Sequence, residues 1–246
     1  MASRRAAVAA IACLVSLATP APARADWLLA AFLGAAATQA STVTVNQPAR
    51  GTNVTLGGVE YQGESFRSPQ YYAVRVSWTG NQTTTLALEG EFIHAKVYAK
   101  TDRPVRMQGT VSRATVDATR PLSSLVQRLS MSHGLNFILA NVALRHGIGR
   151  ADASGRRRVT AVVRAGAGPT MPHAESEIDH VFREQYEQGG LGVQAGGGVE
   201  IRLWQRLAAA GDYKFTWASP EIDVSDGHAH IPSHTHHLTF GLAYRF

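Results

Sequence analysis

The chain has 246 residues, 45% of them hydrophobic, and a formal net charge of +6. It contains one cysteine, so no disulfide can form within the chain and a small disulfide-stabilised fold is excluded. After residue 25, no stretch approaches the run of about 20 apolar residues that a membrane-spanning helix requires, which also excludes a helical membrane protein.

Residues 1–25 have the pattern of a secretory signal peptide. Arg4 and Arg5 give the segment a basic start, an apolar run too short to span a membrane follows, and Ala23-Arg24-Ala25 is an A-x-A cleavage signal. We therefore expect a cleaved signal peptide over residues 1–25 and a mature domain over residues 26–246. The three arginines of the segment supply half of the net charge of +6, so the mature chain carries +3. A lipoprotein anchored at Cys13 is the alternative, although the apolar stretch before Cys13 is short.

Alternation of apolar and polar side chains dominates the mature chain. Successive side chains of a strand point to opposite faces, so the last ten residues would place one apolar set on a single face: Leu238, Phe240, Leu242, Tyr244 and Phe246. Eight segments alternate in this way, and each is long enough, at about 10 residues, for a tilted membrane strand. They lie near residues 27–45, 71–79, 84–99, 136–146, 158–175, 190–204, 207–219 and 236–246.

This pattern predicts an all-β fold, an eight-stranded antiparallel up-and-down transmembrane β-barrel in the bacterial outer membrane. An even number of strands places both chain ends in the periplasm, with short turns on that side and long loops outside. The long loops would lie near residues 46–70, 100–135, 176–189 and 220–235. Within the second, a run after Pro121 has helical spacing and predicts a short amphipathic helix that contains Leu122, Leu125, Val126 and Leu129.

A soluble periplasmic β-sandwich is the rival architecture, because it also uses short alternating strands. The faces opposite the apolar ones carry charges, which a barrel lumen accepts in pairs and a sandwich core does not. We therefore favour the barrel and expect a lumenal network that pairs Glu89, Glu91, Glu200 and Asp212 with Arg75, Arg145, Arg164 and Arg202. Side chains fill an eight-stranded barrel, so a passive pore is not expected.

Imidazole side chains recur at the outer ends of the predicted strands. His94, His133, His173 with Glu175, and His237 fall at a similar height in the up-and-down layout. Such groups at one level suit a divalent metal site or general acid–base catalysis. Histidines at a barrel rim also serve as interfacial polar residues. The sequence leaves open which of these side chains converge and which face the lumen.

Two other motifs carry weaker signals. Ser132 precedes His133, but adjacent residues of a strand point to opposite faces, so a serine nucleophile here would need another histidine. The last loop and the strand after it are rich in histidine, a composition that binds transition metals adventitiously or is simply solvated: His228, His230, His234, His236 and His237.

Five short motifs stand out in chain order: Glu89–Tyr98, Ser132–Phe137, Pro172–Glu175, Asp212–Thr216 and His236–Leu238. In order and spacing they resemble the small outer-membrane barrels related to rhizobial lipid A oxidase. The resemblance implies oxidation of the proximal glucosamine of lipid A to an aminogluconate unit. It also implies dioxygen as the oxidant and a divalent metal, Mn²⁺ or Fe²⁺, as the cofactor.

For that activity we expect one catalytic set and one overlapping ligand set at the rim. The catalytic residues would be His94, His133, His173 and Glu175, and the metal ligands His94, His133, His173 and His237. Basic side chains would bind the lipid A phosphates, namely Lys96, Arg103, Arg106 and Arg128. The expected partner is lipid A within lipopolysaccharide, and the protein would act as a monomer. An exported chain is not expected to bind nucleic acid.

Two other functions stay open. A non-catalytic barrel that stabilises the outer membrane or binds external ligands needs only paired lumenal charges and polar loops. A lipid A deacylase would need a hydroxyl within hydrogen-bond reach of a histidine and a third group that orients this histidine.

Overall fold

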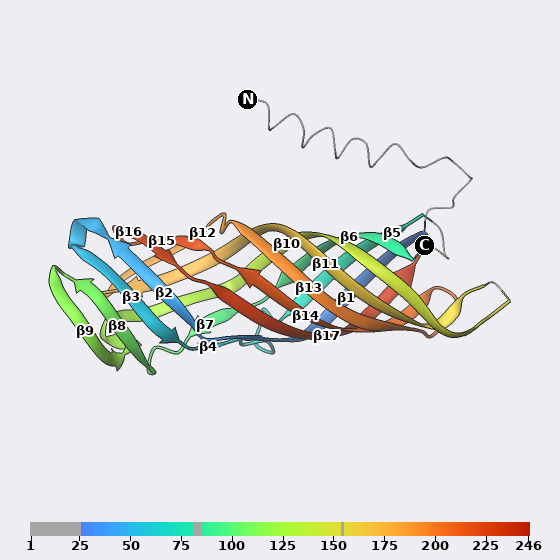
Figure 1. The fold of residues 1–246 in the computed structure, drawn as a ribbon, viewed down its shortest axis with the longest axis horizontal. Helices are drawn as coiled ribbons and strands as arrows, with labels where there is room; N and C mark the ends of the chain where they lie inside the picture. Colours follow the sequence, from blue (N-terminus) through green and yellow to red (C-terminus); the bar gives the residue numbers. More distant parts are fainter. Residues whose placement is uncertain (1–25, 81–84, 154) are drawn as a thin grey trace, which may run out of the picture.

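The computed structural model describes residues 26–80, 85–153 and 155–246 and consists almost entirely of antiparallel strands (Figure 1). The expected signal peptide, residues 1–25, lies outside the described residues. Within the described residues, no helix is long and apolar enough to cross a membrane.

Eight strands close into a barrel. Each is hydrogen-bonded to the next, and the last pairs with the first, so the predicted eight-stranded antiparallel barrel is confirmed. In chain order the strands are β1 (Asp26–Thr38), β5 (Tyr72–Thr79), β6 (Leu86–His94), β10 (Val126–Ala151), β11 (Arg157–Ile178), β13 (Leu191–Arg202), β14 (Leu207–Ala218) and β17 (Ser233–Arg245).

The predicted long loops are largely strands. A second sheet continues beyond the barrel at the end away from the chain's C-terminus (Figure 1). It contains β2 (Ser41–Gln47), β3 (Thr52–Val59), β8 (Pro104–Val111), β9 (Ala114–Pro121), β15 (Glu221–Val224) and β16 (Gly227–His230). Three short strands extend the barrel wall in the same direction, namely β4 (Tyr61–Gln62), β7 (Val97–Ala99) and β12 (Val181–Tyr186). Apolar residues such as Val43, Leu56 and Ile222 form a buried core here, which explains why these segments fold.

Several predicted bounds were wrong for this reason. The segment predicted over 27–45 divides into β1 and β2, and the segment over 84–99 divides into β6 and β7. The predicted amphipathic helix is also wrong. That region contains one short 3₁₀ turn, Leu122–Ser124, and β10 begins at Val126; the other 3₁₀ turn of the described residues, Pro48–Arg50, precedes β3. The apolar residues of the predicted helix are buried against the extension, and cross-strand pairing with β11 overrides the helical spacing.

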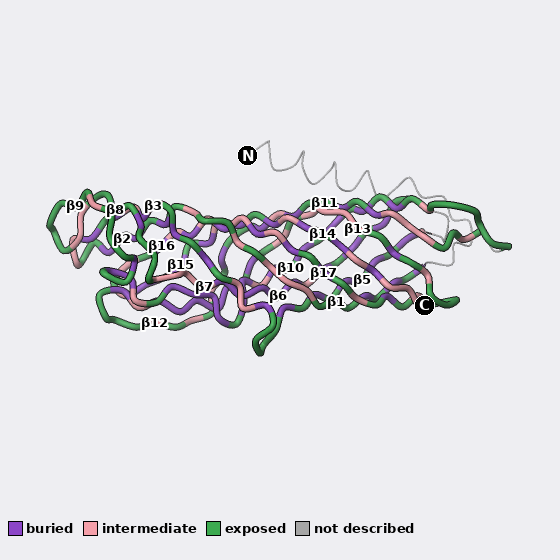
Figure 2. Tube along the Cα trace, turned by 90° about the horizontal axis from the view of Figure 1, so that it is seen from below, coloured by how far each residue is buried: buried purple, intermediate pink, exposed green. Residues whose placement is uncertain are grey.

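Alternation along the barrel strands separates lipid-facing from lumenal side chains, as the burial pattern in Figure 2 shows. On β11, Val163 and Met171 are 58% and 45% exposed, whereas Arg164, between them in sequence and on the other face, is buried. The wall therefore has an apolar exterior and a charged interior, which is the inverse of a soluble core and typical of a membrane barrel.

The lumenal charges form the predicted ion-pair network. The Arg75 guanidinium lies 2.8 Å from Glu91 and 2.6 Å from Asp212, and Lys214 Nζ lies 2.7 Å from Glu91. Arg164 Nε lies 2.8 Å from Glu89, and Arg145 pairs with Glu200. One predicted pairing differs, because Arg202 contacts Asp152 in the β10–β11 connection instead of a lumenal carboxylate. These paired side chains fill the barrel.

Candidate functional site

A row of polar side chains marks the upper edge of the lipid-facing wall. On β6, β10, β11 and β17, the last apolar side chain of the outer face is followed, toward the second sheet, by a polar side chain two residues away on the same face. The apolar residues are Phe92, Ile138, Met171 and Leu238, and the polar residues beside them are, in the same order, His94, Asn136, His173 and His236. Since every second residue of a strand shares a face, these four lie on the outside of the barrel. The apolar belt ends at this row.

Strand β10 carries an irregularity where it passes this row. Met131 pairs with Ala174 and Leu135 with Pro172, so three residues of β10 lie opposite the single residue His173 of β11. The bulge adds two residues to β10. Because this number is even, inward and outward positions alternate in the same way before and after the bulge. Within the bulge the alternation breaks down, and Ser132 Oγ lies 3.2 Å from His133 Nδ1. The expectation that these adjacent side chains point apart was therefore wrong.

Gly134 makes this bulge possible. Its φ of +97° is disfavoured for residues that have a side chain. An added Cβ would also lie only 2.5 Å from Nδ1 of His94 and 2.6 Å from Oδ1 of Asn136.

Two imidazoles and a carboxylate converge at the bulge. One donor atom from each of His133, His173 and Glu175 lies within 4.8 Å of the others. The two Nδ1 atoms are 3.1 Å apart. The Ser132 hydroxyl lies between the groups, 3.3 Å from His173 Nδ1, and donates a short hydrogen bond to Oε1 of Glu175. His133 is exposed, whereas His173 and Glu175 are buried beneath it, so the cluster opens toward the outside of the wall.

Glu175 is fixed by its neighbours. Arg128 donates to its Oε2 at 2.8 Å and Ser130 at 3.4 Å, so Oε1 is the oxygen that faces the imidazoles. Burial alone would raise the pKa of the Glu175 carboxyl, but the hydrogen bonds from Ser132 and Arg128 and the charge of Arg128 hold it below its ordinary value. The carboxyl is therefore an anion at neutral pH.

His173 is oriented from its other side by β12. Its Nε2 lies 3.1 Å from Oε1 of Glu184, and the Tyr186 ring packs on the imidazole with centroids 4.2 Å apart. The sequence analysis did not anticipate Glu184 or Ser130. Only the cross-strand register, which pairs Ser130 and Glu184 with Glu175, reveals them.

The other two predicted ligands lie elsewhere. His94 is on the same outer face and next to the bulge, where it donates to or accepts from Asn136 at 2.9 Å and stacks on Tyr72. Its Nε2 is buried and has no hydrogen-bond partner among the described residues. His237 is inside the barrel, fully buried, with Nε2 2.8 Å from Thr216 Oγ1. The wall separates His237 from the cluster, so it cannot share a metal ion with His173.

The four predicted phosphate-binding residues are not gathered into one site. Each has its own carboxylate neighbour, in the pairs Lys96–Glu64, Arg103–Asp102, Arg106–Asp117 and Arg128–Glu175. Lys96 is buried, so its ammonium group is not presented to a lipid phosphate. Of the four, Arg128 alone belongs to the cluster.

The histidines of the last loop also have separate partners. His228 Nδ1 lies 2.8 Å from Asp223, His230 lies 2.8 Å from Ser219, and His236 accepts or donates hydrogen bonds with Gln39 and Tyr213. Among the described residues they do not form a second metal-binding group.

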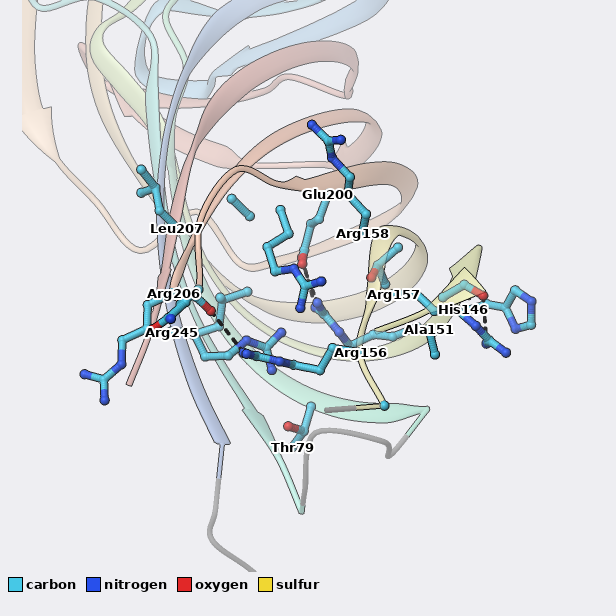
Figure 3. Close-up of a pocket in the computed structure, with 18 of the residues that line it drawn as sticks. Thr79, His146, Ala151, Arg156, Arg157, Arg158, Glu200, Arg206, Leu207 and Arg245 are labelled. Carbon is cyan, nitrogen blue, oxygen red and sulfur yellow. Dashed lines mark hydrogen bonds and ion pairs between the residues drawn. The ribbon is translucent and has the colours of Figure 1, made fainter. Parts of the chain in front are cut away.

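A cavity of about 340 Å³ lies at the opposite end of the barrel, where arginines of the β10–β11 and β13–β14 connections surround it, Arg156 and Arg206 among them (Figure 3). Its deeper arginines already have acidic partners: Arg145 with Glu200, Arg202 with Asp152 and Arg245 with Asp26. Three of the arginines are thus paired, and the lining of the cavity stays rich in arginine.

Comparisons with known proteins agree with this architecture. A family model described as outer membrane protein beta-barrel domain matches residues 9–246. No curated protein is significantly similar to the chain. Among solved structures, Neisserial surface protein A is 8% identical over 90% of this chain and 99% of that chain, with a TM-score of 0.44. The attachment invasion locus protein Ail of Yersinia pestis is 10% identical over 90% and 98% of the two chains, with a TM-score of 0.38. The outer membrane protein AlkL, solved in DMPC bilayers, is 9% identical over 93% of both chains, with a TM-score of 0.40. The chain is an outer-membrane protein of bacteria and belongs to the outer membrane protein β-barrel domain family.

Proposed function

We propose that this barrel is a metal-dependent enzyme that oxidises the proximal glucosamine of lipid A to an aminogluconate unit. The observation that carries the proposal is the convergence of His133, His173 and Glu175 on the outer face of the wall. Two histidines and one carboxylate are the ligand set with which non-haem iron enzymes activate dioxygen while other metal positions stay open.

The donor atoms fit a divalent metal ion. Two metal–nitrogen bonds of about 2.1 Å that meet near a right angle would place their nitrogens about 3 Å apart. The Nδ1 atoms of His133 and His173 have that separation, 3.1 Å. Oε1 of Glu175 faces the same point because Arg128 and Ser130 engage Oε2. Bound there, the metal ion would supply dioxygen activation; His94, beside the cluster, would complete the surroundings without being a required ligand.

The position of the cluster suits a lipid substrate. It lies on the outside of the wall, one outward position above Met171, where the headgroups of the outer leaflet begin. A lipid A glucosamine can therefore reach it from the membrane without entering the filled lumen. Ser132 Oγ lies within the cluster, and Arg128, half exposed beside it, can donate hydrogen bonds to a sugar hydroxyl.

Mass spectrometry of lipid A from cells with and without the protein tests this proposal. We expect the protein to cause the gain of one oxygen atom, and this gain to require air and to disappear when a chelator is added. His173→Asn and Glu175→Gln should abolish the gain. His236→Ala is the matched control, because His236 lies at the same height on a different part of the outer wall. An unmodified lipid A profile from correctly folded protein would contradict the proposal and favour a non-catalytic barrel.

A second function is favoured by a specific observation. The Ser132 hydroxyl lies 3.3 Å from Nδ1 of His173, whose Nε2 lies 3.1 Å from Glu184. A hydroxyl, an imidazole and an orienting carboxylate are the parts of a serine hydrolase, so lipid A deacylation is the alternative. In this reaction Ser132 would attack an acyl ester carbonyl while His173 accepts the hydroxyl proton. The lipid A alcohol would leave with that proton, and water would then hydrolyse the acyl-serine ester and release the fatty acid.

Ser132→Ala separates the two functions. A deacylase would lose its activity, and the lipid A of the parent strain would show the loss of an acyl chain instead of the gain of an oxygen atom. The oxidase should keep measurable oxygen insertion at saturating metal, with a weaker metal affinity, since Ser132 supports Glu175 but is not among the three ligands. Loss of oxygen insertion with retained metal binding would show that Ser132 positions the substrate.

A further inference from the structure

The most exposed large apolar side chain of the described residues is Phe66, at 86%. It lies in the segment that joins β4 to β5, and Figure 2 shows this segment as an exposed projection beside β6. Contact with an apolar surface would remove this side chain from water and would be favourable, since the hydrophobic effect scales with the apolar area that is buried.

The projection is held in a defined conformation. The Tyr71 amide donates to the Ser65 carbonyl at 2.8 Å, and the Ser65 hydroxyl accepts from the amide of Ala36 on β1 at 3.0 Å. At the tip, the Arg67 amide and guanidinium both bind Glu64, at 3.1 and 2.9 Å. Tyr71 is fully buried and fixes the C-terminal end of the projection. Phe66 is therefore presented outward by an ordered turn.

The two ends of the projection, Gly63 and Tyr71, lie at the edge of the lipid-facing apolar belt next to the second sheet. Tyr72, which follows Tyr71, pairs with Leu33 of β1 and His94 of β6, and Leu33 is 58% exposed on the lipid side. At the other end, Gly63 lies against the Ala36 carbonyl of β1. A side chain that leaves the wall at this height meets the outer leaflet, where aromatic residues are enriched.

The projection also borders the candidate site. The backbone at Pro69 lies beside the His94 ring, which stacks on Tyr72 and bonds to Asn136 at the edge of the bulge. The side of the projection that faces β6 therefore adjoins the edge of the candidate site.

We propose that the segment Glu64–Pro69 is a membrane-inserting wedge, with Phe66 embedded in the outer leaflet next to the histidine cluster. Its partner is the lipid surface itself, an interface of headgroups and acyl chains. The Arg67–Glu64 pair stays at the headgroup level, since both groups are charged. This proposal does not depend on the activity proposed above, because lipid insertion requires no catalysis.

Site-specific fluorescence tests the insertion. A Cys13→Ser background leaves no native thiol in the chain, so Phe66→Cys can be labelled with an environment-sensitive fluorophore and reconstituted into phosphatidylcholine vesicles. Val163→Cys, on the lipid-facing wall, and Thr119→Cys, on the exposed strand β9, provide the two reference positions. With brominated acyl chains in the vesicles, we expect the probe at residue 66 to be quenched at least half as strongly as the probe at residue 163.

The same labelled proteins give the contrary result if the wedge does not insert. Quenching at residue 66 equal to that at residue 119, with the barrel folded by heat-modifiable gel mobility, would overturn the proposal. Arg67→Cys provides a second probe position, because this side chain is 78% exposed. We expect the probe at residue 67 to be quenched less than the probe at residue 66 and more than the probe at residue 119. If the probes at residues 66 and 67 are both quenched no more than the probe at residue 119, insertion is excluded.

Discussion

At the scale of single residues, the side chains of the candidate site each form hydrogen bonds with more than one neighbour. Glu175 accepts hydrogen bonds from Arg128 and Ser130 at Oε2 and from Ser132 at Oε1, and these bonds fix the orientation of the carboxylate. Such outer partners of a metal ligand fix its orientation, and their removal usually weakens metal affinity by about 10–100-fold. The cluster is therefore sensitive to residues that would not themselves touch the metal.

Arg128→Gln should weaken divalent metal binding by about 10–100-fold while the barrel stays folded. The glutamine loses the charge that holds Glu175 and can no longer reach Oε2 with the same geometry. Calorimetric titration of the purified protein with Mn²⁺ measures the change. Arg103→Gln is the control, since Arg103 faces Asp102 in a separate loop and its replacement should leave the affinity unaltered. An unchanged affinity in the Arg128 variant would remove Glu175 from the ligand set.

Gly134→Ala should destabilise the bulge. The alanine would be held at a φ of +97° and its methyl group would clash with His94 and Asn136, so we expect a loss of about 1–3 kcal/mol. Chemical unfolding of the reconstituted barrel measures it. Gly90→Ala is a matched control on β6, because an added Cβ there has no atom within 4 Å. Equal stability of the two variants would mean that β10 adopts a different bulge.

At the scale of elements, the sequence predicted the barrel well and the extension poorly. Alternation over β11 or β17 is long and unbroken, so the face of residues such as Val163 and Leu238 follows from period two alone. The extension strands are short, and their partners are remote in sequence, as in β2 with β16. Local patterns cannot specify such pairings, so these segments resembled loops.

The candidate site was predicted in part for a related reason. Period two from Met171 places His173 and Glu175 on the outer face, and the structure follows this count. The bulge that brings His133 to them depends on the register between β10 and β11, which no local pattern contains. His237 differs from Leu238 by one position, and that single step places it inside the barrel.

The lumenal network gives a prediction at this scale. Lys214→Met should cost about 3–5 kcal/mol of stability, because it leaves the buried Glu91 carboxylate with too little positive charge. Adding Glu91→Gln should recover part of the loss. Urea unfolding in lipid vesicles measures both variants. Lys100→Met, which breaks the exposed pair with Glu60, should cost less than about 1 kcal/mol. Equal losses at Lys214 and Lys100 would show that the lumen is hydrated.

At the scale of the whole molecule, the orientation of the barrel decides whether lipid A can reach the cluster. The polar row with His173 and the wedge with Phe66 both lie at the end of the barrel that carries the second sheet, and the start of β1 and the end of β17 lie at the other end (Figure 1). Lipid A occupies the outer leaflet, so the extension must face the cell exterior for the cluster to meet it. An even strand number with long outer connections predicts this orientation.

Labelling of intact cells tests the orientation. A membrane-impermeant maleimide should modify Thr119→Cys on β9 and leave Gln205→Cys, in the β13–β14 turn, unmodified until the outer membrane is permeabilised. Both positions are exposed, so a difference in labelling reports the side of the membrane and not burial. The reverse pattern would place the histidine cluster among inner-leaflet phospholipids. Lipid A would then be out of reach, and the oxidase and deacylase functions would fail together while insertion of the wedge would still be observed.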